Sequence, residues 1–251
     1  MIFSKSTSAN TVKFCYEEQE LRPYLNGYQV MPPDEPGILL ELIKQASKQA
    51  ELNSRFIRRP WLRCQKMVLL GQAHSLFAMI KTPDRQLRYQ FPNNPNNYLL
   101  RGDYVIFFHN KSHKQNYIEN VAEQISRNEF NLHRPKFGFG APRGYVITKR
   151  LEQLNLLANN AYDLTKAIKL MSNNRLDGFI IDRYIGLSIL EKSPAALNIQ
   201  NSKTVAYSDA WHVPFNKQYY ARHKTQIDRF WSLLPALRKK YEAELANRYT
   251  K

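Results

Sequence analysis

The sequence has 251 residues, of which 43% are hydrophobic and 23% are charged. This composition is typical of a globular protein with a sizeable core, and the length is sufficient for two domains or lobes. No apolar run approaches the ~20 residues that a membrane-spanning helix requires, so we expect no membrane span.

The net charge is strongly positive, because 37 Lys and Arg outnumber 21 Asp and Glu and give +16. A basic protein favours an anionic partner, either a polyanion or a small anionic ligand. The cations are spread along the chain without a block of five or six, which argues against a nucleic-acid module. We therefore expect no nucleic-acid partner, and a basic nucleic-acid-binding protein is kept as the second alternative.

The first hundred residues alternate between strand and helix patterns. Residues 1–10 form a polar tail that is too short and polar for an intact secretory signal, and both a removed signal and a cytosolic protein remain open. A loop rich in Pro and Gly occupies 21–37, and Gly71 is a candidate C-cap. The apolar spacing predicts strands at 12–18, 53–60 and 73–80 and helices at 38–52 and 61–72. This order favours a parallel sheet with helices on its faces.

The second half repeats the same kind of pattern after a Pro/Asn-rich loop at 91–97. The expected elements are a strand within 98–110, a turn region at 130–145, a helix at 146–158, a short strand at 161–164, a helix at 165–174, a strand at 175–184, a returning segment at 205–223 and a closing helix at 225–247. A second α/β unit therefore follows the first.

The sequence contains no motif for catalysis or for a cofactor. It lacks GxSxG, the Walker motif, HExxH and a dinucleotide-type GxGxxG, and "GFGAPRG" at 138–144 resembles a phosphate loop only loosely. His109 and His113 are four residues apart but have no acid near them. We expect no enzyme activity, no cofactor and no metal site.

The chain has two cysteines, Cys15 and Cys64, which do not form a CxxC motif. Two buried free thiols are one interpretation. A single disulfide is the other, and it requires an oxidising compartment.

The order of elements, together with several local motifs, resembles the bacterial extracellular solute-binding proteins of family 3, which are periplasmic amino-acid-binding proteins. The motifs are "RPY" at 22–24, "PGILLELIKQASKQAEL" at 36–52, "RRPWLRC" at 58–64, "GQAHSLFAMIKTPDR" at 71–85, "PRGY" at 142–145 and "NNRLDGFIID" at 173–182. The likeness runs from about Val12 to Tyr249. It implies the α/β, two-lobed type II periplasmic-binding-protein fold, in which each lobe has a mixed, mostly parallel sheet flanked by helices and two crossover strands join the lobes.

The resemblance assigns roles to individual residues. Arg85, after Thr82 in the family's T-x-x-R pattern, is expected to pair with a ligand carboxylate, for which a guanidinium is well suited. Asp182 is expected to pair with an α-ammonium group. A surface or interlobe salt bridge is the alternative for Arg85, and a hinge or cap role is the alternative for Asp182.

Other expected ligand-contacting positions follow from the same comparison. Tyr16, Tyr24 and Trp61 are expected to form aromatic walls of the pocket, and packing in the core or in a loop is the alternative for them. Arg143, Gly144 and Tyr145 are expected to form the turn of the second lobe that contacts the ligand. Ala78 and Ile80 stand where the family often carries ligand-binding hydroxyls, and His74 replaces the family's Asp. These departures argue against a standard α-amino-acid site.

Lobe 1 is expected to comprise residues 11–103 and 213–251, and lobe 2 residues 104–212. We expect non-catalytic binding of an anionic or carboxylate-bearing small molecule in the cleft between the lobes, by a monomer that serves an ABC permease. An orphan protein that acts as a sensor or a protein-interaction module is the first alternative. The resemblance implies a periplasmic location, which would allow a disulfide between Cys15 and Cys64.

Overall fold

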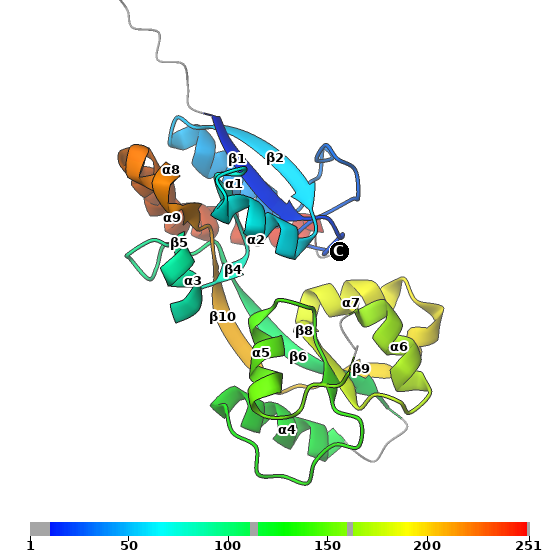
Figure 1. Cartoon of the computed structure of the whole chain (residues 1–251). Helices are drawn as coiled ribbons and strands as arrows, with labels where there is room; N and C mark the ends of the chain where they lie inside the picture. Colours follow the sequence, from blue (N-terminus) through cyan, green and yellow to red (C-terminus); the bar gives the residue numbers. More distant parts are fainter. Residues whose placement is uncertain (1–10, 111–114, 160–162, 250–251) are drawn as a thin grey trace, which may run out of the picture. The chain divides into compact units, whose positions relative to one another are not determined.

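The computed structural model describes residues 11–110, 115–159 and 163–249, and the polar tail at 1–10 lies outside this range. The chain forms two compact units (Figure 1): unit 1 combines the residues up to Leu100 with those from Ala210 onward, and unit 2 covers Arg101–Asp209. The sequence placed the second lobe at 104–212, so both of its predicted boundaries lie three residues further along the chain than those of unit 2. In the part of the chain that the structure describes, no helix is long and apolar enough to cross a membrane.

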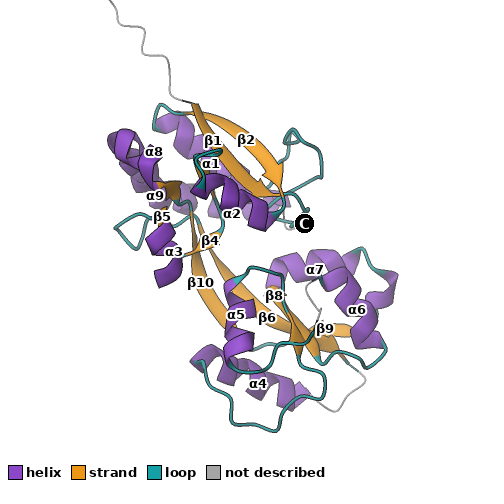
Figure 2. Ribbon diagram, in the orientation of Figure 1, coloured by secondary structure: helices purple, strands orange, loops and turns teal. Residues whose placement is uncertain are grey.

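Unit 1 begins with the alternating order that the sequence predicted. Its first elements are β1 (Thr11–Glu17), α1 (Ile38–Gln49), β2 (Asn53–Arg59), α2 (Trp61–Leu69) and β3 (Ser75–Leu76). Strand β1 is parallel to both β2 and β3, so that Phe14 lies opposite Phe56 on one side and Ser75 on the other. The predicted β-α-β-α-β order is confirmed, and Figure 2 shows β1 beside β2.

The single strand expected at 73–80 is wrong. The segment is interrupted at Ala78, whose φ of 61° lies in the left-handed region that an extended strand cannot contain. Strand β3 stays beside β1, whereas β4 (Met79–Ile80) pairs antiparallel with His212 and Trp211 of β10 (Tyr207–His212). The apolar run concealed the break because both halves are buried.

The rest of unit 1 completes its sheet and its core. The further elements are α3 (Pro83–Arg88), β5 (Tyr89–Gln90), β11 (Phe215–Asn216), α8 (Lys217–Arg222) and α9 (Lys224–Tyr249). The five strands follow the order β2-β1-β3-β11-β5, and β11 is antiparallel to both of its neighbours. Helix α9 packs against α1 and supplies Phe230 and Trp231 to an aromatic core around Phe14 and Phe215.

Unit 2 is built around β6 (Leu100–His109), which is antiparallel to β8 (Gly178–Asp182) and β9 (Ile199–Asn201). Strand β7 (Phe139–Gly140) is parallel to β8, so the sheet is mixed and its central pairs are antiparallel. The helices are α4 (Gln115–Arg127), α5 (Val146–Gln153), α6 (Leu164–Ser172), α7 (Arg183–Glu191) and the short 3-10 turn η1 (Pro194–Ala196). The chain passes between the two units along β6 and β10, because the unit boundaries fall within these strands.

Two helices of unit 2 differ from the sequence expectation. Helix α5 ends at Gln153 rather than at residue 158, because Asn155 has a φ of 54° and the Leu156 N–H bonds back to the Leu151 carbonyl. Helix α4 had no counterpart in the expected elements. The strand expected at 161–164 lies mostly outside the described residues, and Leu164 begins α6.

The sulfur atoms of Cys15 in β1 and Cys64 in α2 are bonded, with 5.3 Å between the Cα atoms. Both residues are fully buried, so the bond fixes α2 against β1, an interior strand of the unit 1 sheet. Cross-links of this kind stabilise mainly by restricting the unfolded chain.

We predict that reduction destabilises the protein. For a sequence separation of 49 residues, the chain-entropy relation gives about 4 kcal/mol of unfolding free energy. Thermal melts with and without a phosphine reductant measure the effect, and the double variant Cys15→Ser, Cys64→Ser serves as a control that the reductant should not change. Equal melting temperatures for the wild type in both conditions, with two free thiols by mass spectrometry, would contradict the bond.

Candidate functional site

The carboxyl ends of the parallel strands of unit 1 define one edge of its sheet. Strands β1, β2 and β3 end at Glu17, Arg59 and Leu76, and the following loops all leave from this edge. In open α/β sheets this is the edge at which ligands bind. Burial raises the pKa of the Glu17 carboxyl, and nearby backbone N–H groups oppose the shift.

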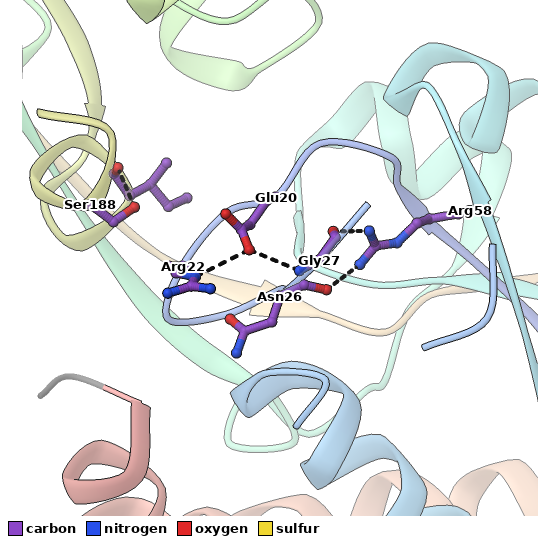
Figure 3. Close-up of polar contacts among 7 residues, drawn as sticks. Glu20, Arg22, Asn26, Gly27, Arg58 and Ser188 are labelled. Carbon is purple, nitrogen blue, oxygen red and sulfur yellow. Dashed lines mark hydrogen bonds and ion pairs between the residues drawn. The ribbon is translucent and has the colours of Figure 1, made fainter. Parts of the chain in front are cut away.

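A buried guanidinium that the sequence analysis missed organises this edge. Arg58, near the end of β2, is only 4% exposed, and its Nε donates to the Tyr16 hydroxyl at 3.0 Å. Its Nη2 donates to the Asn26 carbonyl at 2.6 Å and its Nη1 to the Gly27 carbonyl (Figure 3). The guanidinium carbon also lies 5.0 Å from the centre of the Tyr16 ring.

Glu20 closes the same loop from the other side. Its Oε1 accepts a hydrogen bond from the Gly27 N–H at 2.9 Å and from Arg22 Nε at 3.1 Å (Figure 3). The Glu20 side chain is nearly buried, whereas that of Arg22 is exposed. Residues 20–27 therefore form a loop whose two ends are held by charged side chains within unit 1.

The three aromatic residues expected as pocket walls are buried in unit 1. Tyr16 is fully buried, stacks on Phe77 with ring centres 5.5 Å apart and accepts the bond from Arg58. Tyr24 packs edge-on against Trp211 at 4.8 Å. Trp61 is buried at the first residue of α2. Tyr16 and Tyr24 thus pack against other aromatic side chains of unit 1, as in the alternative of packing in the core or in a loop.

Thr82 and Arg85 lie together at the start of α3. Thr82 is the N-cap, and its hydroxyl accepts the Arg85 N–H at 3.3 Å, as capping residues commonly do. Arg85 Nη1 donates to the Ile80 carbonyl at 2.9 Å, and the side chain is half-buried. The residues of the expected anion-binding segment, from Ile80 to Arg85, are therefore joined by their own hydrogen bonds.

In unit 2, Asp182 is buried and acts as the N-cap of α7. Its Oδ1 accepts the N–H groups of Tyr184 and Ile185 at 3.1 and 3.3 Å, which is the cap role that the sequence left open as an alternative. The strand predicted from the sequence extended to residue 184, because the apolar pattern does not reveal this cap. In the structure, β8 ends at Asp182.

The turn before α5 contains the other expected residues of unit 2. Arg143 is exposed, Gly144 has a φ of 80° that favours glycine, and Tyr145 is the N-cap residue. Thr148, which no sequence motif indicated, donates its hydroxyl to the Pro142 carbonyl at 2.6 Å and closes the turn. A hydroxyl is thus present near this turn, four residues after Gly144.

His74 occupies the position of the family's Asp and is packed rather than exposed. Its Nδ1 accepts the Lys13 N–H at 3.2 Å, and its ring stacks on Tyr219 at 3.9 Å. Burial lowers its pKa, and the positive charges of Lys13, His223 and Arg222 lower it further. We infer that His74 supports the sheet as a neutral side chain. Among the described residues, no group of three or more His, Cys, Asp or Glu side chains could hold a metal ion.

These features define the type II periplasmic-binding-protein fold, an α/β class with two mixed sheets. No family model and no curated protein matches the sequence. Among solved structures, a mutant of ArgBP from T. maritima matches with a TM-score of 0.69 and 12% identity, over 96% of this chain and 95% of that one. A histidine kinase sensor domain with similarity to periplasmic binding proteins gives a TM-score of 0.70 at 12% identity, over 96% of each chain.

The ligand-binding core of GluR0 in complex with L-glutamate also matches. Its TM-score is 0.69 at 15% identity, over 96% of this chain and 99% of that one. At these identities the likeness establishes the fold. The complex with L-glutamate is stated for the GluR0 core and belongs to that protein.

We predict that Arg58→Met strongly destabilises unit 1. The substitution leaves the carbonyls of Asn26 and Gly27 and the Tyr16 hydroxyl without their donor, at a cost of about 2–4 kcal/mol in unfolding free energy. Urea denaturation measures the change. Arg55→Met, at an exposed position of the same strand, is the matched control and should stay within about 0.5 kcal/mol of wild type. Equal effects would show that Arg58 has no organising role.

The lowered pKa of His74 predicts a pH dependence of stability. Because the folded pKa lies below the ordinary value of 6.5, protonation favours the unfolded chain, so stability present above pH 6.5 is lost as the pH falls toward the folded pKa. The variant His74→Gln should lose less unfolding free energy than wild type between about pH 7.5 and pH 5.5. His133→Gln, at an exposed site in unit 2, should follow the wild-type profile. A profile unchanged by His74→Gln would disprove this assignment.

Proposed function

We propose that this chain binds a small amino-acid-like or other carboxylate-bearing molecule and performs no chemistry on it. We further propose that it serves as the substrate-binding component of an ABC-type uptake system. The observation that carries the proposal is the fold shared with ArgBP and the GluR0 core, combined with a guanidinium, Arg85, in the short helix α3 of unit 1. That both units contribute residues to one ligand site stays a prediction from the sequence.

Arg85 is the residue we assign to the ligand carboxylate. A guanidinium carries five N–H donors in a planar fork that can bind a carboxylate through two parallel hydrogen bonds. The bond from its Nη1 to the Ile80 carbonyl orients this fork before any ligand arrives. Such preorganisation lowers the conformational entropy lost on binding.

The charge around this segment supports an anionic ligand. Lys81 precedes Thr82 and reaches the Pro92 carbonyl with its Nζ at 3.5 Å, and Arg88 ends the same short helix. The positive potential of several such cations raises the local concentration of anions. The departures at Ala78 and Ile80, which have no side-chain hydroxyls, favour a ligand that differs from a standard α-amino acid.

A periplasmic location is part of the same proposal. A buried disulfide between Cys15 and Cys64 is of the kind that persists in oxidising compartments and is rare in the cytosol.

Sensing is the second candidate function, and one observation favours it. The fold extends over 96% of a histidine kinase sensor domain with a TM-score of 0.70. Uptake and sensing share the binding step and differ in cells: deletion of the gene abolishes uptake of the labelled ligand if the chain serves a permease. Uptake at the wild-type rate in the deletion strain would instead favour sensing.

We predict that a thermal-shift screen of amino acids and small carboxylates finds a ligand whose effect depends on Arg85. At about one hundred times Kd, such a ligand raises the Tm by about 5 °C or more. Arg85→Ala should abolish the shift, whereas Arg88→Ala, at an exposed residue on the same helix, should retain it. A ligand that stabilises wild type and Arg85→Ala equally would rule out Arg85 as the carboxylate partner.

A further inference from the structure

Helix α2 presents an exposed face on which leucines and cations are interleaved. At 100° per residue, this face covers an arc of about 120° and contains, in angular order, Leu69, Leu62, Lys66, Leu70 and Arg63. Leu62, Leu69 and Leu70 are 49, 46 and 58% exposed. The helix contains no carboxylate, so the face is both apolar and purely cationic.

The opposite face of α2 holds the helix firmly in place. Trp61, Cys64 and Val68 are buried, and Cys64 is bonded to Cys15 in β1. The exposed leucines therefore cannot turn inward without breaking the core of unit 1. A shallow groove of about 320 Å³ runs beside them and is lined by Arg63, Lys66, Met67, Leu70 and Gln72.

The positive charge extends well beyond this helix. Residues 53–88 contain eight Lys and Arg, of which Arg58 is buried, and a single acid, Asp84. The sequence of unit 1 carries 22 Lys and Arg against 11 Asp and Glu, whereas that of unit 2 carries 15 against 10, so the excess is eleven in the first and five in the second. Strand β2, which precedes α2, is an edge strand and adds the exposed Arg55.

We propose that this face of α2, which we call the α2 face, binds the surface of an anionic phospholipid bilayer. Leucines on a surface helix enter the boundary between headgroups and acyl chains, and Lys and Arg between them extend their charged ends to the phosphates. Each cation near an anionic membrane adds attraction, and the excess of cations in the sequence of unit 1 fits an extended charged surface. A small acidic patch on a protein would match only the cations of the helix itself.

Vesicle co-sedimentation tests the proposal with the whole protein. Wild type should bind vesicles that contain equal parts of phosphatidylglycerol and phosphatidylcholine and should not bind phosphatidylcholine alone. Removing the two cations of the α2 face, in Arg63→Ser with Lys66→Ser, should weaken binding about thirtyfold. The pair Leu69→Ser and Leu70→Ser should weaken it about tenfold or more, because both leucines leave the headgroup boundary.

Matched controls separate this face from the general charge of the protein. Lys239→Ser with Lys240→Ser removes two exposed cations from α9, and Leu197→Ser removes an exposed leucine from unit 2. Both should bind within about threefold of wild type. All substituted side chains are exposed, and a thermal melt checks that each variant is folded.

Two results would overturn the proposal. If folded wild type fails to bind the anionic vesicles, the α2 face does not bind a bilayer, and an acidic protein becomes the expected partner. If the α2 and α9 cation pairs weaken binding equally and the leucine pair has no effect, the attraction belongs to the whole protein rather than to this face.

Discussion

The buried guanidinium of Arg58 is the interaction on which the carboxyl edge of unit 1 depends. A cation taken out of water requires acceptors, and Arg58 obtains them from the Tyr16 hydroxyl in β1 and from the carbonyls of Asn26 and Gly27 in the following loop. Because these acceptors come from two different parts of the chain, the loop cannot move away without leaving a charge buried and poorly paired. The need to pair this buried charge therefore fixes the position of the loop.

Other segments of unit 1 are fixed by other means. The disulfide between Cys15 and Cys64 holds α2 against β1, and the Thr82 cap with the bond from Arg85 to the Ile80 carbonyl holds the start of α3. Arg85 therefore lies in a segment with little freedom, which suits a binding residue. The same anchoring of α2 leaves its leucines and cations exposed on a rigid surface.

Much of unit 1 could be predicted from the sequence, because apolar spacing reveals which faces are buried. The order from β1 to β3 and the long closing helix followed from this spacing. The break at Ala78 could not be predicted, since an alanine in a left-handed conformation leaves no trace in an apolar run. Arg58 was missed for a related reason: an arginine in "FIRR" looks like a surface charge, and only the three-dimensional position of its acceptors explains its burial. For Asp182 the sequence left a ligand role and a cap role open, and the start of α7 shows that it acts as a cap.

The central claim is that the chain recognises a carboxylate through a guanidinium in unit 1. Isothermal titration calorimetry with one ligand and its primary amide tests it most directly, because the two differ only in the charge and acceptor oxygens at that group. The amide should bind about a hundredfold more weakly than the carboxylate, since the charge-assisted pair is lost and its donors are left unsatisfied. Equal affinity for the two compounds would contradict the claim.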